Sequence, residues 1–147
     1  MPSDPADPRT TAALECDRTC IAEARRFAAE FLGGVRARRG LPVSTRAEEV
    51  TQLVVSELVT NARKHASGPV LLELRVAGDV VEVGVVDSDP ALPVANGPDP
   101  RRVGRHGLEI VRAVSRGFDV RRGPLGKRVS ARVALADEPP PVGRASA

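Results

Sequence analysis

Residues 56–66 read Ser-Glu-Leu-Val-Thr-Asn-Ala-Arg-Lys-His-Ala, and this stretch says more about the chain than any other. In and just before it, apolar residues recur at the spacing of a helix: Leu53, Val54, Leu58 and Val59. Because four residues are slightly more than one turn, the carboxylate of Glu57 and the amide of Asn61 share a helix face. A carboxylate can accept a proton or order a water molecule, and an amide oxygen can bind a hard cation such as Mg²⁺. Many solvated helices carry such a pair, so its meaning depends on the features that follow it.

The composition limits the classes of function. At 147 residues the chain has the length of one domain with a substantial core. Aromatic residues make up only 2%, without Trp or Tyr, so stacking of bases on aromatic side chains is close to excluded. The net charge of +3 is too small to argue for direct binding of nucleic acid. We find no apolar run that could span a membrane and no N-terminal leader, so we expect a cytoplasmic protein.

We expect one folded domain, residues 10–135, between two disordered tails, residues 1–9 and 136–147, which are rich in proline and acidic side chains. Strands that follow one another as hairpins predict a mostly antiparallel sheet with helices on one face, a two-layer α/β sandwich of the α+β class. Asp17 is the predicted cap of the first helix, and Ser44 or Thr45 that of the second. The predicted elements are strand 10–15, helix 18–39, helix 45–66, strands 70–76 and 80–87, a long loop 88–106, helix 107–115, and strands 117–122 and 127–135.

A second informative feature is Asp87, which ends an apolar strand and is followed by Ser-Asp-Pro. An aspartate at a strand end often only caps a turn. Alternatively, its carboxylate accepts a hydrogen bond from the exocyclic amine of adenine, because a buried acceptor matched to one donor discriminates strongly against bases that lack that donor. The residue alone leaves both interpretations open.

Two glycine-led segments follow. Residues 104–111 read Gly-Arg-His-Gly-Leu-Glu-Ile-Val and open a predicted helix. Glycine lets the backbone approach a phosphate, and a helix N-terminus offers N–H groups and partial positive charge. A plain Gly-rich loop is the alternative. Gly126 and Lys127 lead into the last strand, where basic side chains could face an anion or, as at many hairpin turns, only be solvated.

Glu57, Asn61, Asp87, Gly104-x-x-Gly107 and Gly126-Lys127, in this order, resemble the GHKL-type ATP-binding domain of gyrase, heat-shock chaperones, histidine kinases and mismatch-repair proteins. Residues 56–62 with residues 104–111 downstream are most similar to its short, single-domain bacterial branch. That branch contains the anti-sigma-factor serine/threonine kinases and related regulators of actinobacteria. The resemblance covers roughly residues 10–135, and order and spacing together make it specific.

The resemblance implies the Bergerat ATP-binding fold, with ATP between helices and sheet and the long loop as a lid. It implies that Asn61 binds a Mg²⁺ ion bridging the phosphates, that Glu57 is the base for the attacking hydroxyl or water, and that Asp87 reads adenine. The remaining residues that it places beside the nucleotide are Gly104, Arg105, His106, Gly107, Leu108, Gly126 and Lys127. From its own chemistry, His106 could instead only fill the loop.

Partners also follow from the resemblance. The acceptor is expected to be a Ser or Thr on an anti-sigma-factor antagonist protein, the chain is expected to sequester a sigma factor, and relatives commonly form homodimers. One departure favours a different function: the family's first glycine box is Asp-x-Gly-x-Gly, whereas residues 88–91 after Asp87 contain no glycine. The alternative function is an ATP-sensing switch that binds regulatory partners without phosphoryl transfer.

Overall fold

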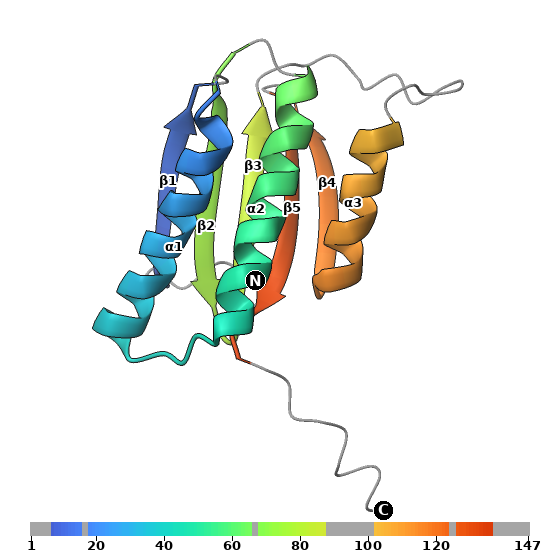
Figure 1. Ribbon diagram of the computed structural model, residues 1–147. Coiled ribbons are helices and arrows are strands. Elements are labelled where there is room, and N and C mark those ends of the chain that lie inside the picture. The colour runs from blue at the N-terminus through green and yellow to red at the C-terminus, as the bar shows by residue number, and fades with distance from the viewer. Residues whose placement is uncertain (1–6, 16–17, 66–67, 88–101, 124–125, 137–147) are drawn as a thin grey trace, which may run out of the picture.

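The computed structural model describes residues 7–15, 18–65, 68–87, 102–123 and 126–136, and for residues 65, 102–106 and 123 it describes the backbone alone. Figure 1 shows the layout of helices and strands. In chain order the described elements are β1 (Arg9–Leu14), α1 (Cys20–Arg39), α2 (Thr45–His65), β2 (Val70–Ala77), β3 (Val80–Asp87), α3 (Arg102–Val114), β4 (Gly117–Gly123) and β5 (Gly126–Ala134).

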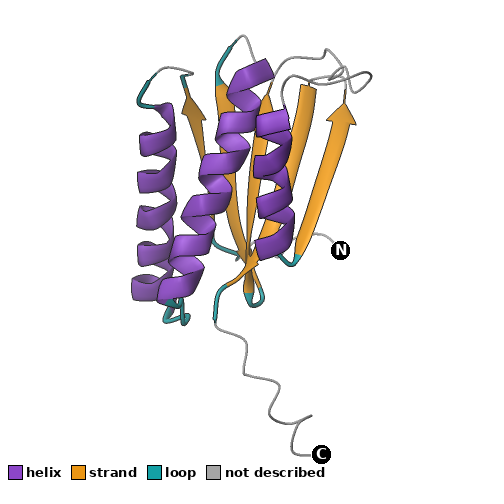
Figure 2. Ribbon diagram, turned by 45° about the vertical axis from the view of Figure 1, so that its right-hand side comes forward, coloured by secondary structure: helices purple, strands orange, loops and turns teal. Residues whose placement is uncertain are grey.

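The strands form one sheet in the order β1-β2-β3-β5-β4, and every neighbouring pair is antiparallel. All three helices of the described chain lie on the same side of this sheet (Figure 2). The predicted α+β sandwich is therefore confirmed. Because β5 returns between β3 and β4, the end of β3 lies beside the start of β5, and Asp87 stands opposite Lys127.

Alternation of apolar residues places the core between the sheet and the helices. On β2 the inward residues Val70, Leu72, Leu74 and Val76 are each at most 2% exposed. From the helices, α2 contributes most, through Val54, Val55, Leu58 and Val59. Burial of one such side chain stabilises the fold by about 1.5–3 kcal/mol. Leu53, which the sequence placed in the apolar stripe, is 37% exposed. The buried stripe of α2 contains Val55 in its place.

The ends of α1 and α2 show which of the predicted capping residues cap a helix. Ser44 Oγ accepts a hydrogen bond from Ala47 N at 2.9 Å, so Ser44 is the cap of α2. Asp17, the predicted cap of α1, lies outside the described residues, and the residue before α1 is Thr19, which makes no capping bond through its side chain. Gly40 ends α1 with φ of 66°, the left-handed conformation that favours glycine at this position.

Two boundaries differ from the predictions. β1 begins at Arg9, and Pro8 O accepts a hydrogen bond from Val76 N at 2.9 Å, so the fold extends into the predicted N-terminal tail. α3 begins at Arg102, before the predicted start at residue 107, because a glycine in a helix costs only about 1 kcal/mol relative to alanine. Residues 1–6, 88–101 and 137–147, most of the predicted tails and lid, lie outside the described residues.

Among the helices described, none combines the length and apolar character that a membrane crossing requires.

Candidate functional site

The elements that carry the predicted site residues meet at one end of the domain, the upper end in Figure 1. Three boundaries meet there: the C-terminal half of α2, the N-terminus of α3, and the sheet edge where β3 ends and β5 begins. The residues in question are Glu57, Asn61, Asp87, Gly104, Gly107, Gly126 and Lys127. The fold thus brings together motifs that are far apart in the sequence.

One close approach in this region joins α2 to α3. The carboxylate of Glu57 lies directly against Gly107, which is buried. A Cβ atom at position 107 would lie 3.3 Å from Glu57 Cδ and would collide with Glu57 Oε1. Glycine at position 107 leaves room for the carboxylate in this position, and a methyl group there would require the end of the Glu57 side chain to move. An acid held against a glycine near a helix N-terminus is well placed to act on an anion bound there.

A buried pair of charges lies at the sheet edge. Asp87 is 2% exposed and Lys127 is 7% exposed, and the distance from Lys127 Nζ to Asp87 Oδ2 is 4.0 Å. Both side chains face the helices, in line with the buried Val85 and Val129. The interpretation of Lys127 as a solvated charge is therefore wrong, because charges this deep in a protein need a partner. The two interpretations of Asp87, as a turn cap and as an acceptor for adenine, both stay predictions.

Asn61 lies one helical turn beyond Glu57 and is half-buried. The structure describes no cluster of three His, Cys, Asp or Glu side chains suited to a metal ion. Mg²⁺ usually keeps several waters and is bound through one or two carboxylates and the phosphates of a nucleotide. Asn61 offers an amide oxygen, a hard ligand of the same kind, one turn from the Glu57 carboxylate.

The segment from Gly104 to Gly107 is helical, whereas the sequence predicted a loop up to residue 106. Gly104 and Gly107 lie within the first two turns of α3 rather than in a loop before it. Leu108 is half-buried and packs against the core, so its described contacts are structural. The side chains of Arg105 and His106 lie outside the described part of the structure.

Two buried hydroxyl groups on α2 were not among the site residues predicted from the sequence. Thr51 Oγ1 and Ser56 Oγ have no hydrogen-bond partner among the described residues. Thr51 is fully buried, and Ser56 directly precedes Glu57. Small polar residues inside an otherwise apolar stripe are the sequence signal that could have drawn attention to them. Buried unpaired hydroxyls are uncommon, so both mark α2 as more polar inside than a purely structural helix.

The opposite face of the sheet carries exposed ion pairs. Arg128, the neighbour of Lys127, points to this face and donates from Nε to Glu73 Oε1 at 3.0 Å, with Glu82 Oε1 at 3.5 Å from its NH2 group. Arg121 Nε donates to Asp119 Oδ2 at 2.8 Å, and this hydrogen bond raises the pKa of the arginine. These charges lie apart from the candidate site, because the sheet separates the two faces.

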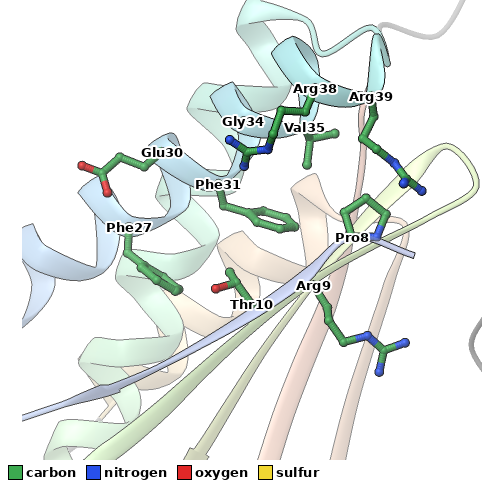
Figure 3. A pocket seen from close by; sticks show the side chains of 10 residues that line it. All are labelled: Pro8, Arg9, Thr10, Phe27, Glu30, Phe31, Gly34, Val35, Arg38 and Arg39. Carbon is green, nitrogen blue, oxygen red and sulfur yellow. The ribbon is translucent and has the colours of Figure 1, made fainter. Parts of the chain in front are cut away.

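A hollow of about 450 Å³ opens at the other end of the domain, between α1 and β1 (Figure 3). Phe27 and Phe31 point from α1 toward β1, and Arg9, Arg38 and Arg39 stand around them. None of the predicted site residues lines it. The hollow is larger than a gap in packing, but it lacks the acid–amide pair and the buried acceptor found at the upper end.

The layers, the α2 acid–amide face and the buried aspartate at the sheet edge together define an ATPase domain of the GHKL type. Residues 14–133 match the family model of the histidine kinase-like ATPase domain, and the chain belongs to this family. ATP is the nucleotide that membership of this family implies. No curated protein sequence matches the chain.

The solved structures that match the chain include these two. One contains the RsbU and RsbW domains of Rv1364c from Mycobacterium tuberculosis, with a TM-score of 0.65 and 18% identity. That match covers 89% of this chain and 33% of the other, so this chain spans about a third of that protein. The other is the histidine kinase domain of a blue-light activated kinase from Erythrobacter litoralis EL346, with a TM-score of 0.42, 20% identity, and coverage of 76% and 61%. At 18% identity, the first likeness shows the fold alone.

Proposed function

We propose that this chain is a cytoplasmic, ATP-dependent serine/threonine kinase that phosphorylates an anti-sigma-factor antagonist and also sequesters a sigma factor. Family membership supports ATP as the substrate, and the sequence resemblance to the short bacterial branch supports the protein acceptor. The observation that carries the proposal is the contact between the Glu57 carboxylate and Gly107, at the end of the domain where Asp87 is buried.

In this mechanism Glu57 is the general base. Its carboxylate accepts the proton of the acceptor hydroxyl as the hydroxyl oxygen bonds to the γ-phosphorus and the bond to the bridging oxygen of ADP breaks. The Glu57 carboxylate on α2 lies against the backbone of Gly107 on α3. Gly107 lies in the second turn of α3, so Glu57 stands about one turn from the helix N-terminus, where phosphate groups are favoured.

The other residues bind and orient. Asn61, on the same helix face, would hold Mg²⁺, which when bound neutralises charge on the phosphates. Asp87 would accept a hydrogen bond from the adenine amine at the sheet edge, where burial makes such a bond selective. Phosphoryl transfer depends mainly on positioning and charge neutralisation, which these few groups can supply.

The test is transfer of label from ATP. The protein, Mg²⁺, labelled ATP and candidate antagonist proteins are incubated beside a Glu57→Ala variant. A matched control is Glu49→Ala, which removes an exposed glutamate from the same helix. We expect label on the antagonist with the parent and with Glu49→Ala, and none with Glu57→Ala. Equal transfer by all three proteins would rule out Glu57 as the base.

A second candidate function is an ATP-sensing switch that binds partners without transfer. The absence of glycine from residues 88–91, directly after Asp87, favours it, since the family's first glycine box is incomplete. Tight nucleotide binding with no transfer to any antagonist, in the same experiment, would support the switch over the kinase.

A further inference from the structure

The strand at one margin of the sheet, β1, has a strand neighbour on one side only (Figure 1). In the described part of the chain it pairs with β2, and its other edge is the end of the sheet. An edge strand presents backbone N–H and C=O groups that can pair with another chain, and proteins usually guard it with charge or with proline inside the strand. β1 reads Arg-Thr-Thr-Ala-Ala-Leu, so its first residue alone is charged and the edge is open to a further strand.

The hollow between α1 and β1 opens beside this strand (Figure 3). On its α1 side it is lined by Phe27 and Phe31, two of the chain's three phenylalanines, and both are only partly buried against the core. From β1, the half-buried Thr10 faces the same space with a small side chain. The volume of about 450 Å³ lies in the range of binding pockets, about 300–1,000 Å³, so apolar side chains of a partner can enter it.

The charge around the hollow is mainly positive. Of the four charged residues that line it, Arg9, Arg38 and Arg39 are basic and Glu30 is acidic. The guanidinium of Arg38 lies against Gly34, which also lines the hollow. Because interfaces pair potentials of opposite sign, the surface that complements this hollow carries carboxylates around an apolar centre.

A strand added to β1 would meet both features. It would lie about 4.8 Å from β1, and its side chains would alternate between the two faces of the sheet. Those on the helix side would enter the hollow beside Phe27 and Phe31, and those on the other side would pass Arg9, which lies on the open face. The segment that fits is therefore extended, with apolar residues alternating with acidic ones. In strand addition, backbone bonds supply affinity and the pockets for alternate side chains supply specificity.

We propose that the edge of β1 and the hollow beside α1 bind an acidic, extended segment of a partner protein, which joins the five-stranded sheet as a sixth strand. The partner is a protein because the N–H and C=O groups of a strand edge pair with another peptide backbone. The inference goes beyond the proposed function, since the hollow lies at the other end of the domain from the nucleotide site and none of the predicted site residues lines it.

The first test uses a labelled peptide of the length of β1, six residues, in which leucine alternates with glutamate. A second peptide carries lysine at each glutamate position, and fluorescence anisotropy measures the binding of both to the parent protein. We expect saturable binding of the acidic peptide and at least about tenfold weaker binding of the basic one. Failure of the acidic peptide to bind, or equal binding of the two, would overturn the inference. Neither result bears on the nucleotide site, which titration with ATP tests separately.

Two charge reversals on α1 test where the peptide binds. Arg38→Glu places a negative charge at the hollow and should weaken binding of the acidic peptide at least about tenfold. Arg25→Glu makes the same change at an exposed residue of α1 that does not line the hollow, and it should change the affinity by less than about twofold. Equal effects of the two reversals would show general attraction to a basic protein and would overturn the assigned site.

Methylated peptide amides test whether the peptide adds as a strand. Every second N–H of an extended peptide points to the same edge, so methylation of one alternate set should abolish binding and methylation of the other should preserve it. Loss of binding with both sets, or with neither, would overturn the added strand. Sedimentation of the parent without peptide tests another occupant, since a dimer that becomes a monomer in Arg38→Glu would assign the edge to a second copy of the chain and overturn the inference.

Discussion

Lys127 and Arg128 are neighbours on one strand, and both pair with carboxylates, yet they have little else in common. Lys127 faces the helices, and its side chain is 9% exposed. It pairs with Asp87, whose side chain is 3% exposed. Arg128 faces solvent, and its side chain is 33% exposed. It pairs with Glu73, whose side chain is 36% exposed. The two residues differ by one position along the strand, and successive side chains of a strand point to opposite faces of the sheet.

Burial makes these two pairs energetically unequal. Two charges removed from water must stay together, since removing one partner leaves the other uncompensated. Charges at the surface are solvated and screened whether or not they are paired, so an exposed pair contributes about 0–1 kcal/mol. The buried pair is therefore a fixed feature of the domain, and the exposed pairs are replaceable.

The largest effect is expected from breaking the buried pair. Lys127→Met should lower the free energy of unfolding by about 3–5 kcal/mol, because Asp87 loses its cation in a buried setting. Urea denaturation measures this change. The double variant Asp87→Leu with Lys127→Met, which removes both charges, should recover most of the loss. A single variant as stable as the parent would mean that Lys127 is not held where the structure places it.

The two faces also differ in what covers their glycines. Glu57 lies against Gly107 on the helix side, whereas the guanidinium of Arg128 lies over Gly84 on the open side. Gly107→Ala should reduce phosphoryl transfer, because the new methyl group displaces the Glu57 carboxylate. Its stability should change by less than about 1 kcal/mol, since the end of the glutamate side chain can move and alanine favours the helix. In Gly84→Ala the arginine can swing into solvent, so stability should change by less than about 1 kcal/mol. Equal transfer by the two variants would contradict the special role of the Glu57 contact.

A smaller effect is expected on the open face. Arg128→Met should lower the free energy of unfolding by at most about 1 kcal/mol, since its pairs with Glu73 and Glu82 are partly exposed. Urea denaturation beside Lys127→Met gives the comparison directly, because the two substitutions are chemically alike and adjacent. A loss as large as that of Lys127→Met would remove the distinction between the two faces.

Salt should produce the smallest effect. Raising the ionic strength from about 0.1 M to about 1 M shortens the screening length from about 10 Å to about 3 Å. The stability difference between the parent and Arg128→Met should then shrink, while that between the parent and Lys127→Met should persist. Equal sensitivity of both differences to salt would show that the Lys127–Asp87 pair is exposed in solution.

The sequence predicted the elements with strong periodicity. Alternation in β2, the hairpin to β3 and the helical spacing around Glu57 led to the observed sheet and helix, because each pattern reflects burial on one face. The site residues on these elements converge as their order implied. The cap at Ser44 was also readable, since its hydroxyl precedes an amphipathic run.

Other features could not be read locally. Gly-Lys-Arg-Val at residues 126–129 contains two adjacent basic residues, and which one is buried depends on the register of β5 against β3. The start of α3 at Arg102 was missed because the glycines at 104 and 107 suggested a loop, whereas packing against α2 carries the helix through them. In both places tertiary contacts decide the structure of a locally ambiguous sequence.

The central claim is that one turn of α2 and the buried end of β3 form a nucleotide site. Its most direct test is calorimetric titration with ATP, with and without Mg²⁺, of the parent, Asn61→Ala and Arg128→Met. We predict saturable, Mg²⁺-dependent binding by the parent and by Arg128→Met, and loss of that binding in Asn61→Ala, because the metal loses its protein ligand. Absence of binding by the parent, or undiminished binding by Asn61→Ala, would contradict the assignment of this helix face.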